Sequence, residues 1–368
     1  MLFQVDIANL PEYKYDRFYS FVKMKIAVGF SGGVDSLVTS ILLREKGYEI
    51  HAVTFVFSRA QLESCFQKHV KSAAKKLNIP HDFVDLRMNF ERVLNYFKNG
   101  YLSGETPNPC VFCNEHVKWP GLFEFAGQIG AEKVATGHYA KIEQLQHRFV
   151  IRKGDDPEKD QSFFLWNLTP EMLEKVELPL GGVEKSNVKE IAQQFGYDDF
   201  AIQKESTGPC FVGQNYRDTL KDMMTPAENP GKGNFLDADG EMLGRHNGYP
   251  FYTISQRKGL GLEGHGKKFV RSINPCKNQV LLGNAGDLWS SNFYLRDWHL
   301  HFPELATKEK VEVKIRYRSQ KAKGKIHFEG ELIHIALLEP EWAIAPGQTA
   351  ALYFDDRLIG GGYIDAIL

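Results

Sequence analysis

The stretch Lys25–Ser36, KIAVGFSGGVDS, decides the fold, because an apolar run typical of a buried strand leads into a glycine-rich turn and then a helix. Gly32 and Gly33 allow backbone angles that other residues rarely adopt, and they expose N–H groups to a ligand. The following helix points the positive end of its dipole at the same place. The stretch therefore predicts a phosphate-binding loop, to which Ser31 and Ser36 add hydroxyl donors.

The glycine spacing separates this loop from two common alternatives. The nucleoside-triphosphate P-loop has Lys directly after its last glycine, and the dinucleotide fingerprint reads G-x-G-x-x-G. Val34 and Asp35 stand where that Lys would be, and the glycines fit neither pattern. SGGVDS instead resembles the pyrophosphate loop of the ATP pyrophosphatases, which pass AMP to a substrate oxygen. The resemblance implies that Asp35 helps to hold Mg²⁺ on the released pyrophosphate; the alternative is an ordinary strand-to-helix turn capped by an Asp.

Composition limits the class of protein. A chain of 368 residues predicts two or three domains, and its 43% hydrophobic and 25% charged residues are typical of a globular protein. Residues 1–23 lack the features of a signal peptide and are expected to form an extension, and no apolar run is long enough to span a bilayer. Five cysteines make no disulfide framework, which favours a reducing cytoplasm. With a net charge of -1, a nucleic acid would need a local basic surface.

Strand and helix patterns alternate after the phosphate loop. The sequence predicts helices at 37–46, 67–77, 90–98 and after 114, and strands at 49–57, 82–85 and 134–136. This alternation predicts a doubly wound parallel sheet, with ligands at the carboxyl ends of its strands, where the phosphate loop and Thr136–His138 should both emerge. Phe55 lies near the end of the second strand and is expected either to pack on an adenine ring or to serve as a core aromatic.

Three of the five cysteines lie near turn-forming residues. Pro107, Asn108 and Pro109 predict a loop that presents Cys110 and Cys113 at C-x-x-C spacing. That spacing alone fits half of a zinc site, a dithiol redox pair, two cluster ligands or two unrelated thiols. Cys210 is expected in a second loop, behind Gly208 and Pro209, whereas Cys65 and Cys276 are isolated.

The second half of the chain is predicted to be mainly β-structure. Asp239–Gly240 separates two short apolar segments and predicts a hairpin, and a basic loop follows at 255–271, SQRKGLGLEGHGKKFVR. From about Asn284 onward, short alternating strands favour a compact antiparallel barrel. We therefore expect an extension at 1–23, a catalytic domain at 24–207, a mainly-β linking domain at 208–283 and a barrel at 284–368.

A strand at Val313–Arg318 would carry a basic ridge. Alternation places Lys314, Arg316 and Arg318 on one face and apolar side chains on the other. A basic strand face of this kind is often simply exposed to solvent and binds no ligand. The basic loop at 257–271 favours instead a track for RNA phosphates.

Taken together, the motifs resemble one family from about Lys25 to the C-terminus. They are GFSGGVDS, TPNP followed by CN, VATGHYA, KDQSFFL with PLGG, a late Cys followed by Phe and Gly, SQRKGLG, IRYR, and PGQ with GGGYI. The chain resembles the tRNA-specific 2-thiouridylases (MnmA), which replace the C2 oxygen of the wobble uridine of tRNA with sulfur. The resemblance implies an α/β catalytic domain like that of the adenine nucleotide alpha hydrolases, followed by the linking domain and the barrel.

The resemblance also implies a reaction and its residues. ATP would activate the uridine oxygen as an adenylate, and sulfur would displace AMP. A persulfide would form on Cys210, and Cys113 would release its sulfur or form a disulfide during transfer. ATP would be bound by Gly29, Phe30, Ser31, Gly32, Gly33, Val34, Asp35, Ser36, Phe55 and Gly137. The target base would contact Asn108, Pro109 and Cys110, and the tRNA would contact His138, Lys159, Asp160, Gln161, Arg316, Tyr317 and Gln348. The family suggests tRNAs for Lys, Glu and Gln, and a sulfur-donor protein.

Two departures from the family pattern fall in the sulfur-handling segments. Cys110 stands where an Asp is expected after NP, and STGP precedes Cys210 where SQDI is usual. Cys110, Cys113 and Cys210 could together hold a four-iron, four-sulfur cluster, as in related thiolases. The alternative is that Cys110 is a passive thiol and the persulfide route operates unchanged.

Two other classes compete with this interpretation. An amide- or lysidine-forming ligase would also adenylate its substrate, but it transfers nitrogen and needs no cysteine. A non-catalytic RNA-binding protein would keep the barrel and the basic ridge and would bind no ATP, which the intact SGGVDS disfavours.

Overall fold

The computed structural model describes residues 23–368 except 63, 204–207, 214, 263 and 308–310. The extension expected at 1–23 lies, apart from residue 23, outside the described residues. The chain divides into two compact units, and each contains segments that are distant in the sequence. Unit 1 comprises Met1–Glu91, Cys113–Glu205 and Asp356–Leu358, and unit 2 comprises Arg92–Phe112, Ser206–Asp355 and Ile359–Leu368.

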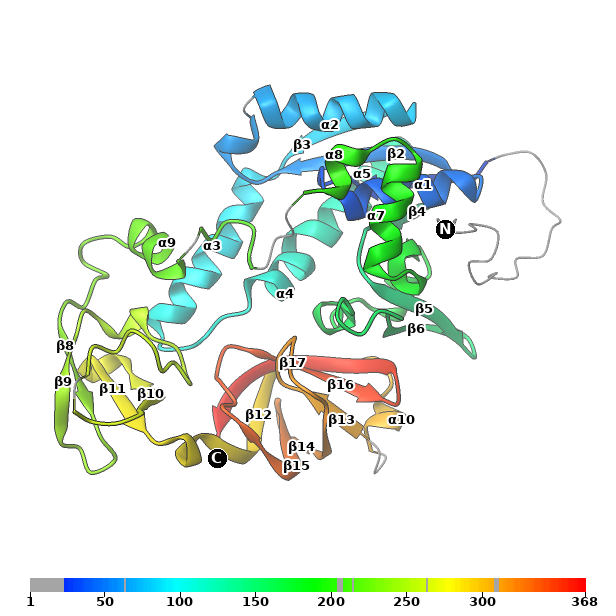
Figure 1. The fold of residues 1–368 in the computed structure, drawn as a ribbon. Coiled ribbons are helices and arrows are strands. Elements are labelled where there is room, and N and C mark those ends of the chain that lie inside the picture. Colours follow the sequence, from blue (N-terminus) through cyan, green and yellow to red (C-terminus); the bar gives the residue numbers. More distant parts are fainter. Residues whose placement is uncertain (1–22, 63, 204–207, 214, 263, 308–310) are drawn as a thin grey trace, which may run out of the picture. The chain divides into compact units, whose positions relative to one another are not determined.

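A five-stranded parallel sheet forms the centre of unit 1 (Figure 1). Its order is β3-β2-β1-β4-β7, and every neighbouring pair is parallel. The strands are β1 (Lys25–Gly29), β2 (Glu49–Val56), β3 (His81–Asp85), β4 (Lys133–Ala135) and β7 (Val176–Glu177). The parallel sheet predicted from the alternating pattern is confirmed.

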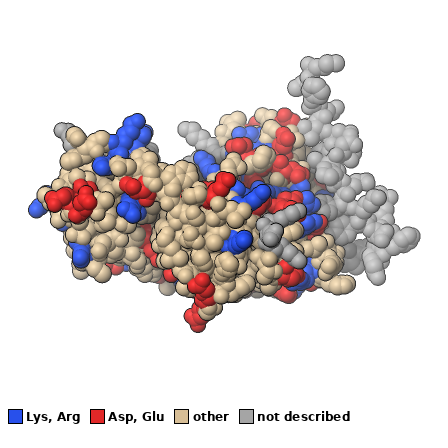
Figure 2. Space-filling model, turned by 90° about the horizontal axis from the view of Figure 1, so that it is seen from below, with Lys and Arg blue, Asp and Glu red and all other residues tan. Residues whose placement is uncertain are grey.

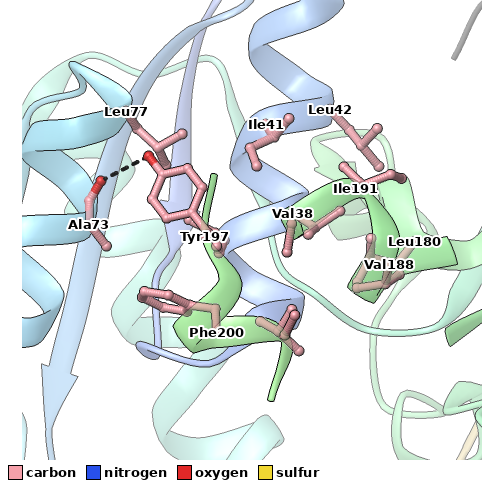
Figure 3. Close-up of a cluster of buried hydrophobic side chains, with 14 of the residues drawn as sticks. Val38, Ile41, Leu42, Ala73, Leu77, Leu180, Val188, Ile191, Tyr197 and Phe200 are labelled. Atoms are coloured by element: carbon pink, nitrogen blue, oxygen red, sulfur yellow. Dashed lines mark hydrogen bonds between the residues drawn. The ribbon is translucent and has the colours of Figure 1, made fainter. Parts of the chain in front are cut away.

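Helices cover both faces of this sheet, as the alternation of side chains along β2 shows. Ala52 packs in a buried cluster with α1, whereas its neighbour His51 faces Phe125 of α5, with ring centroids 5.3 Å apart. Figure 3 shows part of the first cluster, in which apolar side chains of α1, α2 and α7 interlock and the Tyr197 hydroxyl donates to the Ala73 carbonyl. The helices of this unit are α1 (Val34–Glu45), α2 (Ser64–Leu77), α5 (Trp119–Ile129), α6 (Pro170–Leu173), α7 (Lys185–Gln194) and α8 (Asp198–Ala201).

A hairpin of β5 (Ala140–Leu145) and β6 (Arg148–Lys153) extends unit 1, and β6 pairs with Arg357 and Leu358. Helix α3 (Arg87–Leu102) and helix α4 (Pro109–Cys113) each begin in one unit and end in the other. Short helical segments of other types connect the elements: η2 (Arg59–Leu62), η3 (Asn114–Lys118), η4 (Ser162–Phe164), η5 (Pro179–Gly182), η6 (Tyr249–Phe251), η7 (Pro275–Lys277) and η8 (Ala285–Leu288).

Unit 2 contains a mixed four-stranded sheet of order β10-β11-β8-β9. The Asp239–Gly240 hairpin is confirmed, because β8 and β9 pair antiparallel on either side of it. β11 pairs parallel with β8, and Phe97 and Tyr101 of α3 pack in the core of this sheet. The elements are α9 (Tyr216–Met223), β8 (Gly233–Leu236), β9 (Met242–His246), β10 (Phe269–Asn274) and β11 (Gln279–Gly283).

Six strands of unit 2 form the C-terminal barrel, and the prediction of an antiparallel barrel is confirmed. The order is β12-β15-β14-β13-β16-β17, and β12 also pairs with β17, which closes the sheet. The elements are β12 (Trp289–Leu300), α10 (Pro303–Ala306), β13 (Val311–Lys314), β14 (Ala322–Glu329), β15 (Leu332–Trp342), β16 (Thr349–Phe354) and β17 (Arg357–Ile367).

The basic ridge predicted along Val313–Arg318 is wrong. β13 ends at Lys314, and a turn follows in which the Ser319 amide donates to the Arg316 carbonyl. Lys314 is only 8% exposed, so it shares no solvent face with Arg316. The period-two argument failed because the strand stops halfway through the segment to which it was applied.

No helix among the described residues has the length and apolar character to cross a membrane.

Candidate functional site

The predicted phosphate loop connects β1 to α1 in unit 1. Gly32 has a φ of +80°, and a Cβ there would lie 3.0 Å from Cγ2 of Val70, so both its angle and its surroundings require glycine. The Ser31 amide donates to Oγ of Ser36 over 3.1 Å, and Ser36 Oγ donates to the Gly33 carbonyl over 2.9 Å. The hydroxyl of Ser36 therefore fixes the shape of the loop, and the first turn of the 12-residue helix α1 follows it directly.

Asp35 lies in that first turn and meets two groups that sequence reasoning missed. Its Oδ1 accepts a hydrogen bond from the Tyr139 hydroxyl at 2.6 Å and from Nζ of Lys185 at 2.5 Å. Lys185 is buried at the start of α7, and its ammonium also lies 5.6 Å from the centre of the Tyr139 ring. The signal that could have found Lys185 is its position three residues after PLGG, a motif already recognised. A buried cation next to a phosphate loop can bind phosphate oxygens.

Gly137 brings the Thr136–His138 segment against α1, as predicted from the shared sheet edge. A Cβ at Gly137 would lie 3.0 Å from the carbonyl carbon of Asp35, so only glycine permits this approach. Phe55 is partly buried, and its ring lies 6.2 Å from that of Phe57 and against Gly121 of α5. The adenine contact of Phe55 stays a prediction.

His138 is held as a neutral ring beside this loop. Its Nδ1 lies 2.7 Å from Oγ1 of Thr136, and its ring stacks on Trp119 with centroids 5.9 Å apart. Burial, with a smaller contribution from the charge of Lys118, lowers the pKa of His138 to about 3. At neutral pH His138 can therefore donate or accept a hydrogen bond but cannot act as a cation.

The KDQ segment, residues 159–161, is held by hydrogen bonds to the backbone of neighbouring residues and of Tyr139. Asp160 is buried, and its Oδ1 accepts hydrogen bonds from the amides of Gly154 and Ser162, both at 3.1 Å. Gln161 exchanges hydrogen bonds with the backbone of Tyr139, through its own amide and its Oε1. These two side chains shape the loop that carries Lys159, and contact of the three with tRNA stays a prediction.

Cys110 and Cys113 lie on a helix, not on the predicted loop. Asn108 caps α4, because its Oδ1 accepts from the Val111 amide at 3.5 Å, and Pro109 occupies the first helical position, where no N–H is needed. The residues around Pro109, which the sequence predicted to form a loop, therefore start a helix. Cys110 is partly exposed and Cys113 is 4% exposed, so Cys113 is not a loop thiol free to swing.

Cys210 lies in a non-helical segment and its side chain is exposed, as predicted for the second cysteine loop. Cys65 and Cys276 are also exposed. Within the described part of the chain, no group of three or more His, Cys, Asp or Glu residues is arranged to hold a metal ion.

The segment that precedes α4 is bound to the barrel inside unit 2. The Thr106 amide donates to the Pro346 carbonyl at 2.8 Å, and Nε2 of Gln348 donates to the Thr106 carbonyl at 2.9 Å. Asn108 Nδ2 donates to Oγ1 of Thr349 at 3.3 Å. We call residues 105–108 the anchored segment. Gln348 was predicted to contact tRNA, and here its side chain holds this segment.

Arg296 adds an ion-pair link to the anchored segment. It donates to Glu105 Oε2 at 2.9 Å and to Asp365 Oδ1 at 2.8 Å. Elsewhere in the barrel, the guanidinium of Arg316 donates to the carbonyls of Trp342 and Ala343, and burial lowers its pKa. Tyr317 lies under the ammonium of Lys314, 5.7 Å from its ring centre. Contact of Arg316 and Tyr317 with tRNA stays a prediction.

Three protein families match successive parts of the chain. Residues 24–214 match the tRNA methyl transferase HUP domain, residues 217–284 the tRNA methyl transferase PRC-barrel domain, and residues 290–364 the aminomethyltransferase beta-barrel domain. Together they cover the parallel sheet, the mixed sheet and the barrel in the order in which these occur.

Curated relatives match over almost their full length. The tRNA-specific 2-thiouridylase MnmA 2 of Phocaeicola vulgatus is 40% identical over 344 residues, which is 92% of this chain and 97% of the relative. MnmA 1 of Bacteroides fragilis strain ATCC 25285 is 39% identical over 352 residues, covering 92% and 97%. MnmA of Syntrophomonas wolfei is 40% identical over 348 residues, covering 93% and 100%.

Proposed function

The chain belongs to the tRNA-specific 2-thiouridylase (MnmA) family, and we propose that it uses ATP to replace the C2 oxygen of the wobble uridine of tRNA with sulfur. The observation that carries the proposal is the phosphate loop at the N-terminus of α1, with Lys185 buried against Asp35. A loop of this kind suits transfer of AMP, and cysteines at 113 and 210 suit transfer of sulfur.

Adenylation is the first step of the proposed reaction. The C2 oxygen of the uridine attacks the α-phosphorus of ATP, the bond to the β-phosphate oxygen breaks, and pyrophosphate leaves. The backbone amides of the loop and the ammonium of Lys185 would stabilise the negative charge that develops on the phosphates. Mg²⁺ fits this site, because it prefers oxygen ligands and is usually bound by one or two carboxylates plus substrate phosphates, and Asp35 supplies a carboxylate. When bound, Mg²⁺ would neutralise charge on the phosphate oxygens.

The remaining ATP-binding positions proposed here are Gly29, Phe30, Ser31, Val34, Ser36, Phe55 and Gly137.

Sulfur transfer is the second step. The terminal sulfur of a persulfide on Cys210 attacks C2 of the adenylated base, and AMP leaves with the original oxygen. The Cys113 thiolate attacks Sγ of Cys210, the persulfide S–S bond breaks, and the terminal sulfur stays on C2 while a Cys113–Cys210 disulfide forms. A thiol reductant then restores both cysteines. The alternative order, in which Cys113 first releases hydrosulfide, leaves the same disulfide.

The exposure of the two cysteines supports this division of roles. Cys210 is exposed, so a sulfur-donor protein can reach it, and Cys113 is buried on α4, where water is excluded. We propose that Asn108, Pro109 and Cys110 contact the target base and that the tRNA is contacted by His138, Lys159, Asp160, Gln161, Arg316, Tyr317 and Gln348. The substrates proposed are the tRNAs for Lys, Glu and Gln, in the cytoplasm.

An iron–sulfur route is the second candidate, and one observation favours it. Cys110 and Cys113 are three positions apart on α4, so they lie on one side of the helix. We nevertheless propose the persulfide route first, because Cys113 and Cys210 suffice for it without a third ligand, and keep the cluster as the alternative. Anaerobic purification followed by iron and sulfide analysis separates the two. Thiolation by a preparation without bound iron eliminates the cluster route, and activity proportional to four irons per chain eliminates the persulfide route.

The test of function is nucleoside mass spectrometry of tRNA from cells that lack this gene. We expect 2-thiouridine to be lost on deletion, to return with the wild type, and to stay absent with Cys113→Ser or Cys210→Ser. Full restoration by both cysteine variants would refute sulfur transfer through these cysteines, and 2-thiouridine unchanged on deletion would favour a different reaction, such as that of the nitrogen-transferring ligases, which need no cysteine.

A further inference from the structure

A buried threonine on β2 holds the start of the phosphate loop. Thr54 is 1% exposed, and its Oγ1 donates a hydrogen bond to the Phe30 carbonyl. The Phe30 amide donates to the Val53 carbonyl at 2.7 Å. The Ser31 amide belongs to the same peptide plane as the Phe30 carbonyl, and it donates to Oγ of Ser36 at 3.1 Å. The peptide that opens the loop is therefore held on both sides and cannot rotate without breaking a hydrogen bond.

His81, at the start of β3, completes this chain of hydrogen bonds. Its Nε2 lies 2.8 Å from Oγ1 of Thr54. The Thr54 hydroxyl has one hydrogen, which it donates to the Phe30 carbonyl, so Nε2 of His81 must be the donor to Thr54. Nδ1 of His81 is buried and has no hydrogen-bond partner among the described residues, as suits an unprotonated nitrogen. The contacts therefore assign the neutral tautomer with its hydrogen on Nε2.

The surroundings keep this ring neutral. Burial is the main cause that lowers the pKa of His81 to about 4. The charges that face it are Asp82, which raises the pKa, and Lys71 and His51, which lower it. A second proton would lie on Nδ1, for which the described residues supply no acceptor. At neutral pH the ring therefore remains a donor to Thr54.

The ring of His81 also packs on the residue that Thr54 binds. Its centroid lies 6.0 Å from that of Phe30, edge to face, and 4.6 Å from that of Phe83. Phe30 is 1% exposed and belongs to the buried cluster that includes α1. His81 thus reaches Phe30 in two ways, by ring packing and through the Thr54 hydroxyl, and substitutions can separate the two.

The orientation of the loop matters because the phosphates find no broad positive field on the protein. The net charge is -1, and Figure 2 shows positive and negative side chains interspersed on one face of the molecule. Local donors must then bind the phosphates, and a hydrogen bond weakens steeply when its angle is poor. A rotation of the peptide between Phe30 and Ser31 would misdirect the amides that follow it.

We propose that His81 is a positioning residue for ATP, because its Nε2–H, acting through the Thr54 hydroxyl, fixes the peptide from which the phosphate loop starts. Its effect on ATP is indirect and is exerted through the loop backbone. That the ligand is ATP rests on the proposed function.

The test compares variants of the full chain at pH 7. Thr54→Val removes the hydroxyl and keeps the shape, His81→Phe removes the donor and keeps a ring, and Thr54→Ser keeps the hydroxyl. Thr39→Val is the matched control, since its equally buried hydroxyl bonds one turn back within α1. The affinity for ATP with Mg²⁺ is measured by calorimetry, and urea unfolding confirms that each variant is folded.

We expect Thr54→Val and His81→Phe each to bind ATP about fivefold or more weakly, the factor that corresponds to loss of one ordinary hydrogen bond. Thr54→Ser and Thr39→Val should stay close to wild type. The KM for ATP in pyrophosphate release should rise in parallel, whereas the affinity for tRNA should not change.

The double variant separates positioning from packing. If His81 acts through Thr54, adding His81→Phe to Thr54→Val should weaken ATP binding by less than about twofold more, because residues that act through one another are not additive. Full multiplication of the two single effects would show that His81 acts by packing and would overturn the proposal. So would an ATP affinity that is unchanged in Thr54→Val.

Nitrogen NMR of histidine-labelled wild type gives a readout that needs no buried variant to fold. With the His81 signals identified by their loss in His81→Gln, we expect the hydrogen on Nε2, and a hydrogen on Nδ1 would contradict the proposal. Wild type that binds ATP with the expected dependence on His81 and Thr54, yet forms no 2-thiouridine, would refute the proposed reaction and leave this inference standing.

Discussion

The phosphate loop and the anchored segment are fixed in place by different kinds of contact. The phosphate loop is formed mostly by neighbours in the chain, such as Ser31, Gly33 and Ser36. The anchored segment, at 105–108, is fixed by residues roughly 240 positions away, including Gln348 and Thr349. Sequence motifs can reveal the first arrangement, because its parts are adjacent, whereas the second is visible only in the folded barrel.

Replacement of Lys185 by Ala should have the largest effect on the phosphate loop. It removes the cation next to the phosphates and leaves Asp35 with Tyr139 as its described partner. We expect adenylation, followed as pyrophosphate release, to slow by about 100-fold or more, which is typical for loss of one charge-stabilising donor. The affinity for tRNA should not change. Lys185→Arg is the matched control and should recover part of the rate; a Lys185→Ala enzyme with full adenylation would show that the loop acts without it.

Replacement of Gly347 by Ala should disturb the anchored segment. Its φ is +84°, and a Cβ would lie 2.8 Å from Cβ of Glu105 and 3.0 Å from the Thr106 amide. We expect a loss of about 1–3 kcal/mol in the free energy of unfolding, and sulfur transfer slowed by about tenfold with ATP binding retained. Gly330→Ala is the matched control, since Gly330 has a φ of +62° but open space around it. Equal slowing of sulfur transfer in both variants would attribute the effect to backbone strain alone.

Replacement of Gln348 by Ala tests whether its main role is in tRNA binding or in holding the anchored segment. The variant loses one hydrogen bond to the Thr106 carbonyl, worth about 1 kcal/mol. If Gln348 mainly holds the anchored segment, the variant should transfer sulfur about fivefold more slowly and its Cys110 should be alkylated faster. Its affinity for tRNA should stay the same. Gln320→Ala, at an exposed barrel position, should change neither quantity. A weaker affinity for tRNA with an unchanged rate would instead support the tRNA contact that we propose for Gln348.

The smallest effect concerns acid stability near the phosphate loop. Burial lowers the pKa of His81 to about 4, and its Nε2 lies 2.8 Å from Oγ1 of Thr54. The folded pKa is below the unfolded value of 6.5, so stability is complete above about pH 6.5 and falls as the pH approaches 4. Urea unfolding at pH 7 and pH 5 should show this loss in the wild type, and His81→Gln should reduce it. An identical loss in the variant would assign the effect to other groups.

Sequence reasoning succeeded where hydrophobic period and glycine geometry decide the structure. The parallel sheet, the strand–turn–helix shape of the loop at 29–36, the approach of Gly137 and the closing barrel followed from local patterns. It failed at Pro109, which starts a helix as readily as it ends one, and at Lys314, where a strand stops before its pattern does. Lys185 and Tyr139 were missed because their shared partner, Asp35, lies more than 100 positions away in the chain. Contacts between residues so far apart in the chain produce no repeating pattern in the sequence.

The proposed reaction has two parts, adenylation of tRNA at the phosphate loop and transfer of sulfur through the cysteines. Its most direct test is a single-turnover reaction with purified enzyme, persulfide donor, ATP and unmodified tRNA, in which pyrophosphate and 2-thiouridine are measured together. We expect wild type to form both, Cys113→Ser and Cys210→Ser to release pyrophosphate without 2-thiouridine, and Lys185→Ala to form little of either. Formation of 2-thiouridine by both cysteine variants, or by wild type without pyrophosphate release, would contradict it.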